Sequence, residues 1–348
     1  MKKTLLLLAF LCSFSLSTMA QKTRFVDATE LGIHGYTKQT DKSPYYRFDH
    51  TGYAFNKSIV GSSKHSSGLY IVFKTNSSKI VATWENTPRR LTDNMNGILQ
   101  LGLDLYVKTD GKWKFSAVGR ASTVPEKNRR TKVLLKNLSN EEREYLLYLP
   151  GWCELRDLKI GVDPNATIEG LPTPFRHKVI VHGSSITHGA SASRSGMTYT
   201  ALMSRNLGIN FVNFGFSGNC KLQPEFLEFL KTCEADAFVF DAFSNSTPKQ
   251  MEERLHNFVD GLVKAHPGKP LIFLQTPIPN RPHYNKTATR LMKEIKKRYK
   301  DVYFLDVPNV VGDNGTVDMV HPNDLGFDRF VKAYQPKIAK ILKKYGIK

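Results

Sequence analysis

Hydrophobic and polar residues alternate along the first half of the chain, between about residues 25 and 162. A period of two places successive side chains on opposite faces of a strand, so this half is expected to consist of strands. The strands are expected at 69–73, 80–84, 101–107, 132–135 and 145–149. Polar breakers such as Thr109-Asp110-Gly111-Lys112 separate them. Many short strands at regular spacing predict an antiparallel β sandwich.

The pattern changes after residues 163–174, a stretch rich in proline and polar residues that is interpreted as a linker. Beyond it, short apolar runs alternate with amphipathic segments. The runs lie at 179–181, 211–214, 237–240, 271–274 and 302–305, and helices are expected near 197–207, 224–233, 248–265, 284–299 and 325–344. This alternation predicts a parallel sheet covered by helices on both faces. In such sheets the chemistry lies at the carboxyl ends of the strands.

The amino terminus has the features of a secretory signal. Met1-Lys2-Lys3 is positively charged, residues 4–17 form an apolar run, and Thr18-Met19-Ala20 places small residues before a cleavage site at Gln21. We therefore expect export to the periplasm or the cell exterior. No later segment approaches 18 consecutive apolar residues, so no stable membrane insertion is expected after cleavage. The predicted domains are a signal peptide (1–20), a β-sandwich domain (21–165) and an α/β domain (166–348).

Composition narrows the class of protein. The 348 residues are 41% hydrophobic and 23% charged, which excludes disorder, collagen and disulfide-rich scaffolds. The net charge of +19 suits a solvated surface, an acidic polysaccharide, an anionic envelope or nucleic acid. After signal cleavage Cys153, Cys220 and Cys233 remain, and no C-x-x-C spacing supports a zinc site or a redox pair. No metal is expected.

Candidate chemistry begins at the first strand of the second half. That strand runs into His182-Gly183-Ser184-Ser185, ahead of a helix, where a hydroxyl can lie beside backbone N–H groups. Near the other end of the chain, Asp318 and His321 stand three residues apart before the last helix. The carboxylate can hold the imidazole Nδ1–H, which leaves Nε2 to take a proton from a serine.

Two further strand ends carry possible hydrogen-bond donors. Gly218 follows the second strand and Asn245 follows the third, and a glycine N–H and an Asn amide are donors that an oxyanion hole needs. Other polar residues near these motifs are given structural interpretations. Asp241 is interpreted as a turn acceptor, and His182 and His188 as loop packing, with the alternative that one of them lines the pocket. Asp104 is interpreted as the holder of a sandwich turn, with approach to the active-site cleft as the alternative, and Gln275-Thr276-Pro277 is either a pocket wall or a plain strand end. The three tryptophans are interpreted as core residues, with a sugar platform as the alternative for one of them: Trp84, Trp113 and Trp152.

Together, four segments in this order resemble the SGNH, or GDSL-type, hydrolase superfamily. The first block is Gly183-Ser184-Ser185-Ile186-Thr187, with Ser184 where the family usually has Asp. The second is Ser217-Gly218-Asn219, and the third, Phe243-Ser244-Asn245-Ser246, keeps the Asn but lacks the usual Gly and Asp. The last block is Asp318-x-x-His321. The resemblance implies a catalytic triad of Ser185, His321 and Asp318, with an oxyanion hole formed by Ser185, Gly218 and Asn245.

The sequence Gly102-Leu103-Asp104-Leu105-Tyr106 resembles the Gly-x-Asp-Leu-Tyr signature of a β-rich amino-terminal domain that precedes some secreted SGNH hydrolases. The resemblance then covers nearly the whole mature chain. It implies a three-layer α/β/α, flavodoxin-like hydrolase domain behind an all-β sandwich. It also implies esterase activity without a metal or organic cofactor.

Four functions are considered for this sequence. The first is a secreted serine esterase that removes short acyl groups, acetyl foremost, from a small-molecule or glycan ester. The second is a lipase or thioesterase for longer acyl chains, and the third is a non-catalytic glycan-binding protein. The fourth, a nucleic-acid binder, is disfavoured by the export signal and by the lack of a compact basic-aromatic motif.

Overall fold

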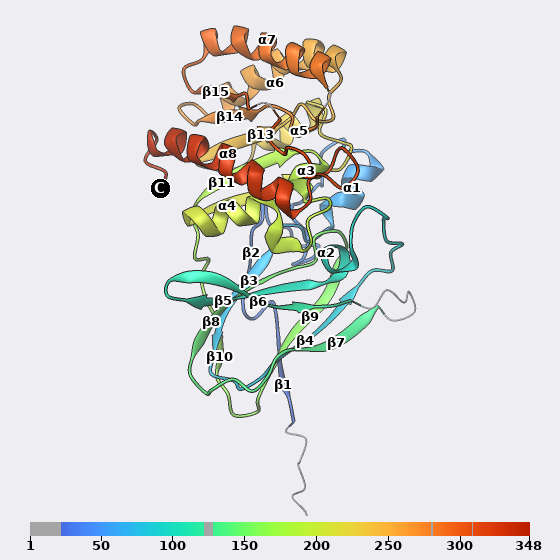
Figure 1. The fold of residues 1–348 in the computed structure, drawn as a ribbon, viewed down its shortest axis with the longest axis vertical. Helices are drawn as coiled ribbons and strands as arrows, with labels where there is room; N and C mark the ends of the chain where they lie inside the picture. The colour runs from blue at the N-terminus through green and yellow to red at the C-terminus, as the bar shows by residue number, and fades with distance from the viewer. Residues whose placement is uncertain (1–21, 122–127, 280, 308) are drawn as a thin grey trace, which may run out of the picture.

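The computed structural model describes residues 22–121, 128–279, 281–307 and 309–348. The predicted signal peptide at 1–20 lies outside the described residues. Antiparallel strands form one half of the molecule, and a parallel sheet flanked by helices forms the other (Figure 1). No helix in the described part of the chain is long and apolar enough to cross a membrane.

The first half is a sandwich of two antiparallel sheets. One sheet has the order β1 (Arg24–Asp27), β9 (Leu155–Val162), β4 (Ile80–Asn86) and β7 (Arg129–Leu135). The other has the order β10 (Ile168–Gly170), β3 (Tyr70–Thr75), β8 (Arg143–Tyr148), β5 (Leu103–Thr109) and β6 (Lys112–Gly119), with β2 (Ile33–His34) also paired to β3. Strand β10 lies within the stretch interpreted as a linker, so part of that stretch is an edge strand.

The second half is a five-stranded parallel sheet. Its order is β12 (Ile209–Gly215), β11 (Arg176–Gly183), β13 (Ala237–Asp241), β14 (Leu271–Leu274) and β15 (Val302–Leu305). Numbered along the chain, this is the 2-1-3-4-5 order of flavodoxin-like folds. The predicted fold class, an all-β sandwich followed by a flavodoxin-like α/β/α domain, is confirmed.

Helices cover both faces of this sheet, because successive side chains of each strand point to opposite faces and are apolar on both. Ile180 of β11 faces one core cluster, whereas its neighbours Val179 and Val181 face the other. The Ile180 side is covered by α5 (Pro224–Lys231), α6 (Pro248–Ala265) and α7 (Pro282–Arg298), and the other side by α4 (Tyr199–Leu207) and α8 (Asp324–Lys343). The short elements are α1 (Lys57–Ser63), α2 (Gly97–Leu101), α3 (Ser185–His188) and a 3-10 turn, η1 (Ser195–Met197).

Both faces of the second sandwich sheet are buried, one against the first sheet and the other toward the α/β half. Ile71 and Phe73 of β3 are buried between the two sheets, and Tyr70 and Val72 point the other way, toward the α/β half. The cluster on that outer face also contains Tyr106, Leu146, Tyr148, Phe175 and Ala201. Apolar packing of the sheet's outer face therefore docks the sandwich onto α4.

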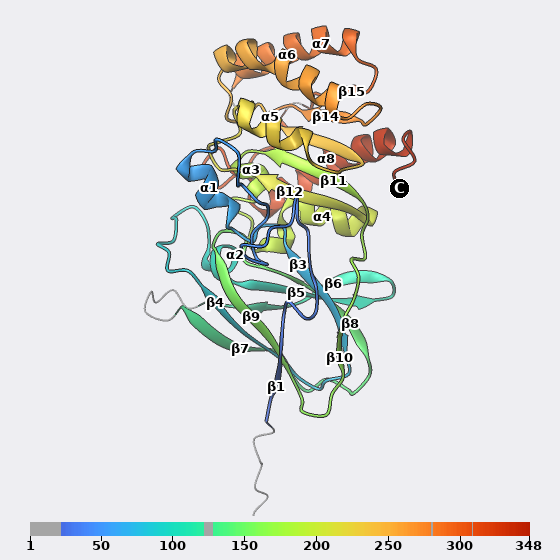
Figure 2. The ribbon, with the colours of Figure 1, turned by 180° about the vertical axis from the view of Figure 1, so that it is seen from behind.

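The chain between β2 and β3 also packs on the α/β half, where α1 lies beside α5 (Figure 2). Phe48 is fully buried in the same core cluster as the residues of α5 and α6. Its neighbour Arg47 is also fully buried and donates hydrogen bonds to the carbonyls of Gly215, at 2.9 Å, and Ser62, at 2.6 Å. The two halves therefore share a core.

Asp104 of the Gly-x-Asp-Leu-Tyr signature lies at this interface, and the expectation that it holds a sandwich turn is wrong. It is 1% exposed in β5, and its Oδ2 accepts the backbone N–H of Gly196 at 2.8 Å. Its Oδ1 lies 3.2 Å from Nε of Arg194. Burial raises the pKa of Asp104 to about 6, while Arg194, Gly196 and Arg205 favour its charged form. The signature carboxylate thus holds η1 of the other half.

Asp104→Ala should lower the free energy of unfolding by about 3 kcal/mol, because it leaves a buried N–H and part of a buried ion pair without a partner. Urea denaturation at pH 7 measures this loss. The matched control is Asp110→Asn, which removes an ion pair to Lys114 at a side chain that is 84% exposed and keeps a residue type that tolerates the φ of +51° at this turn. That control should change stability by less than about 0.5 kcal/mol. Equal effects of the two substitutions would contradict the role given to Asp104.

Candidate active site

The serine of the first block stands at the start of α3, directly after β11. Ser184 caps this helix, since its Oγ accepts the N–H of Ile186 at 3.1 Å. Gly183 has no room for a side chain, because a Cβ there would collide with Thr187 and Asp241. This tight turn exposes only 5% of Ser185.

Asp241 holds this turn from β13. Its Oδ2 accepts from Ser184 Oγ at 2.6 Å, from the Ser184 N–H at 3.2 Å and from Thr187 Oγ1 at 3.1 Å. Its Oδ1 accepts from Ser244 Oγ at 2.6 Å. Burial raises the pKa of Asp241, and these hydrogen bonds oppose that shift. Asp241 is an acceptor, as expected, but it accepts hydrogen bonds from the serine turn as well as from the loop after its own strand.

Ser185, His321 and Asp318 meet in one hydrogen-bonded chain. Ser185 Oγ lies 2.8 Å from His321 Nε2, and His321 Nδ1 lies 2.7 Å from Asp318 Oδ2. The other carboxylate oxygen, Oδ1, accepts the backbone N–H groups of Val320, at 3.1 Å, and His321, at 2.8 Å. These bonds fix the carboxylate relative to the ring, and the ring relative to the hydroxyl.

Asp318 has a further partner, Asn94, that no motif predicted. Asn94, in the segment between β4 and α2, lies with Nδ2 2.9 Å from Asp318 Oδ2. Burial alone would raise the pKa of Asp318, but hydrogen bonds from Asn94 and His321 hold it well below its ordinary value. The carboxylate therefore stays charged beside the imidazole. A separation of 224 residues leaves no spacing pattern from which this contact could be inferred.

The predicted oxyanion donors follow strands that end at the same level. Gly183 of β11 pairs with Gly215 of β12 and with Asp241 of β13 in the parallel ladder. The loops after these three strands therefore begin at one edge of the sheet. Gly218 and Asn245 lie in the second and third of these loops.

The local geometry of both residues leaves donors available. Gly218 has a φ of +68°, which favours glycine, and open space beside its Cα. Asn245 Oδ1 accepts the N–H of Cys220 at 3.4 Å, which turns the amide NH₂ the other way. Among the described residues, no hydrogen bond uses the N–H of Ser185 or of Gly218.

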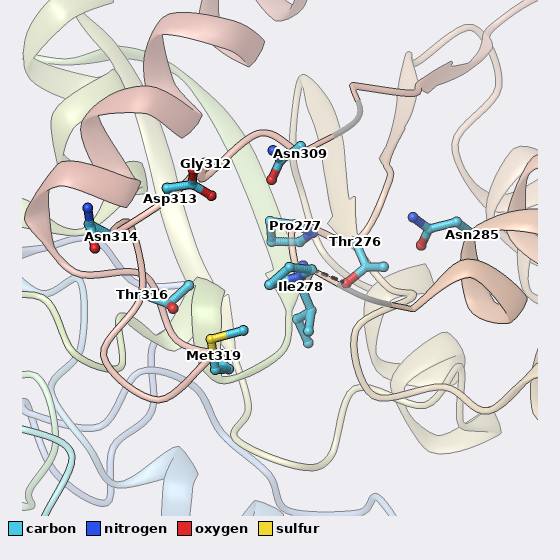
Figure 3. Close-up of a pocket in the computed structure, with 11 residues that line it drawn as sticks. Thr276, Pro277, Ile278, Asn285, Asn309, Gly312, Asp313, Asn314, Thr316 and Met319 are labelled. Carbon is cyan, nitrogen blue, oxygen red and sulfur yellow. Dashed lines mark hydrogen bonds between the residues drawn. The ribbon is translucent and has the colours of Figure 1, made fainter.

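A polar hollow of about 580 Å³ lies beside the loop that carries Asp318 and His321 (Figure 3). Its walls come from the loops after β14 and β15 and from the start of α7. The lining residues are Thr276, Pro277, Ile278, Pro279, Asn285, Asn309, Gly312, Asp313, Asn314, Thr316 and Met319. Of the segment considered as a pocket wall, Thr276 and Pro277 line the hollow, whereas Gln275 bonds to Thr289 at 3.2 Å.

The two histidines that flank the serine turn are fully buried. His182 bonds to the Phe214 carbonyl at 3.1 Å, and burial lowers its pKa to about 4. His188 stacks on Trp152 with ring centroids 3.7 Å apart, and its Nε2 lies 3.4 Å from Nδ1 of His65. Burial holds the pKa of both His188 and His65 well below the ordinary value. These histidines are packing residues, as expected.

The remaining candidates are structural as well. Trp84 and Trp152 are buried, and Trp113 is partly buried against the outer face of the sandwich sheet. No three His, Cys, Asp or Glu side chains of the described residues gather into a group that could hold a metal ion.

Comparison with known proteins agrees with this architecture. A model of the GDSL-like lipase/acylhydrolase family matches residues 176–339, and the GxDLY model, which describes the N-terminus of SGNH-hydrolase-type esterases, matches residues 23–168. A GDSL-like protein from Bacteroides ovatus ATCC 8483, known from a crystal structure, is 40% identical over 92% of this chain and 98% of that one, with a TM-score of 0.88. No curated protein matches the chain significantly.

Two more distant structures share the fold. The salicylyl-acyltransferase SsfX3 from a tetracycline biosynthetic pathway is 20% identical over 92% of this chain and 97% of its own, with a TM-score of 0.69. A family two carbohydrate esterase from Cellvibrio japonicus is 12% identical over 92% of this chain and 98% of its own, with a TM-score of 0.61. From the family models and the 40% identical structure, the chain belongs to the GDSL-like lipase/acylhydrolase family, in the form that carries a GxDLY amino-terminal domain.

Proposed function

We propose that the protein is an exported serine esterase that hydrolyses short-chain esters, acetyl esters foremost, carried on carbohydrate. The observation that carries the proposal is the hydrogen-bonded chain from Ser185 through His321 to Asp318, at 2.8 and 2.7 Å. A serine linked in this way to a histidine and a carboxylate is an activated nucleophile.

In the proposed reaction, His321 Nε2 takes the hydroxyl proton as Ser185 Oγ attacks the ester carbonyl. Asp318 holds the ring in the tautomer that presents Nε2 and stabilises the imidazolium that forms. His321 then gives the proton to the leaving alcohol, which leaves an acyl group on Ser185. A water molecule, deprotonated by the same Nε2, attacks the acyl carbon. His321 then returns this proton to Ser185 Oγ as the bond to the acyl group breaks and the carboxylic acid leaves.

The negative charge that develops on the carbonyl oxygen needs donors that are already in place. We assign this role to the N–H groups of Ser185 and Gly218 and to the amide of Asn245. Their support is the common edge on which the three strands end and the absence of competing partners for these two N–H groups among the described residues. Each such donor contributes about 2.7–4 kcal/mol at the transition state.

Three features support a sugar ester as substrate. The lining of the hollow beside the triad loop includes three amide side chains, two hydroxyls and one carboxylate, which suit a polyhydroxylated alcohol. The family two carbohydrate esterase shares the two-domain fold. The predicted mature chain keeps a net charge of +17 once Lys2 and Lys3 are removed, which favours approach to an anionic glycan. The signal-like residues 1–20 support export.

A lipase or thioesterase remains the second candidate, and one observation favours it. Val317, Met319 and Leu325 are apolar side chains that are 53%, 63% and 44% exposed, and they flank His321 in sequence. Such side chains could contact a longer acyl chain. The acyl-length experiment below separates the two candidates.

Ser185→Ala should abolish nearly all hydrolysis of p-nitrophenyl acetate, because the acyl-enzyme cannot form without the hydroxyl. Circular dichroism and the urea midpoint should match those of the wild type, since Ser185 Oγ bonds to His321 alone in the described structure. Retention of more than about a tenth of the wild-type kcat would mean that another group is the nucleophile.

Asp318→Asn should lower kcat by about 10³–10⁴-fold while changing KM little, because the carboxylate acts on the imidazolium of the transition state. Steady-state kinetics with p-nitrophenyl acetate measure both constants. The control is Asp328→Asn, an acidic residue of α8 that lies outside the hollow and pairs with Lys332 at 2.7 Å. It should leave kcat within about twofold. A loss of only two- to threefold for Asp318→Asn would show that His321 works without this carboxylate.

Acyl preference is tested with p-nitrophenyl esters of two to twelve carbons and with acetylated xylan or another acetylated glycan. We expect kcat/KM to fall from acetyl to octanoyl, as the proposed short-chain preference requires, and we expect acetate to be released from the glycan. Equal or faster turnover of octanoyl esters, with no acetate released, would support the lipase or thioesterase.

A further inference from the structure

The amino-terminal domain reaches the triad through the segment that joins β4 to α2. Asn94 of this segment lies with Nδ2 2.9 Å from Asp318 Oδ2 and 3.3 Å from His321 Nδ1. The His321 ring nitrogen lies 2.7 Å from the same carboxylate oxygen. Two donors, one from each half of the protein, thus converge on a single oxygen of Asp318.

The backbone of this segment is fixed on both sides. The carbonyl of Asn94 accepts the hydroxyl of Ser191 at 2.8 Å, on the chain that follows α3. Two residues on, Asn96 Nδ2 donates to the carbonyl of Ser193 at 2.9 Å. On the sandwich side, Gln100 is fully buried and its amide bonds to the carbonyls of Met95, at 2.8 Å, and Thr92, at 3.2 Å. The Asn94 amide is therefore held in place before any substrate arrives.

The hydrogen bonds of the Asp318 carboxylate show which of its oxygens depends on the Asn94 amide. Its Oδ1 is fixed by two backbone N–H groups of its own loop, whereas Oδ2 receives only the Asn94 amide and the imidazole among the described residues. The Asp318 side chain is 33% exposed, so water would compete for Oδ2 if the amide were absent. The amide occupies the second acceptor direction of Oδ2 and so keeps the carboxylate aligned with Nδ1.

We propose that Asn94 is a positioning residue of the active site, supplied by the amino-terminal domain, which orients Asp318 toward His321. The inference rests on the proposed serine esterase function. It gives the GxDLY-type domain a direct part in the reaction, beyond support of the fold.

The first test compares Asn94→Ala with Asn76→Ala, a substitution in the same domain that is remote from the triad. The Asn94 side chain bonds only to Asp318 and His321 in the described structure, whereas Asn76 Oδ1 accepts the N–H of Thr167 at 2.9 Å. Asn94→Ala should lower kcat for p-nitrophenyl acetate about tenfold and leave KM within about twofold, because one hydrogen bond to a charged group is lost. Asn76→Ala should lower the urea midpoint and leave kcat within about twofold. A merely structural role for Asn94 would make the two variants alike.

The second test places a carboxyl at the amide's position. In Asn94→Asp, two carboxyl groups share a site, so the pKa of one is strongly raised. When protonated, the introduced group donates to Asp318 as the amide does, and when ionised it repels Asp318. The kcat of Asn94→Asp relative to wild type should therefore fall as pH rises, whereas that of Asn94→Ala should be flat. A flat profile for both variants would overturn the proposal.

The third test is a double-mutant cycle. In an Asp318→Asn background, Asn94→Ala should cost less than about twofold in kcat, because its acceptor is already changed. An undiminished tenfold loss in that background would contradict the proposal.

The rate at which a fluorophosphonate labels Ser185 separates the inference from the function on which it rests. If wild-type protein neither labels nor hydrolyses esters, the proposed function fails. If wild type does both and Asn94→Ala does both equally fast, the function stands and the role of Asn94 fails.

Discussion

The docking of the sandwich onto the α/β half is the constraint on which the active site depends. Tyr70 and Val72 of β3 pack on the far side of their sheet against α4, and Arg47 crosses to the carbonyl at the end of β12. Asp104 fixes η1 through the N–H of Gly196. Because Asn94 and Asp318 belong to different halves, their contact at 2.9 Å exists only while these interfaces hold.

Both ends of the serine helix are held by buried polar groups. At its start, Asp241 binds Ser184 and Thr187. At its end, the His188 ring contacts Trp152 and His65 of the sandwich half. Burial holds the pKa of both histidines well below the ordinary value, so the rings that pack at this end of the helix are uncharged. The sandwich therefore fixes the helix that carries Ser185 as well as the loop that carries Asp318.

Local patterns predicted much of this architecture. The alternation in 69–73 and the apolar run 237–240 each correspond to a strand, because burial of one face or of both faces leaves a periodic trace in the sequence. The resemblance to four sequence blocks implied a triad, and Ser185, His321 and Asp318 form one hydrogen-bonded chain. The oxyanion role of Gly218 and Asn245 stays a prediction, supported by the common edge at which their strands end. Local sequence periodicity could not predict the contacts between the two halves. Asn94 has no feature in the sequence that links it to Asp318, 224 residues away. Asp104 lies on a strand, and Gly196, whose N–H it accepts, is 92 residues away.

In the proposed mechanism Ser185 carries the acyl group during turnover. The most direct measurement is rapid quenching of the wild-type protein with p-nitrophenyl acetate, followed by peptide mass spectrometry. We expect an acetyl adduct on Ser185 that forms within the burst of p-nitrophenol and disappears as substrate is exhausted. Steady turnover with an adduct at another residue, or with no adduct when deacylation is slowed at low pH, would contradict this mechanism.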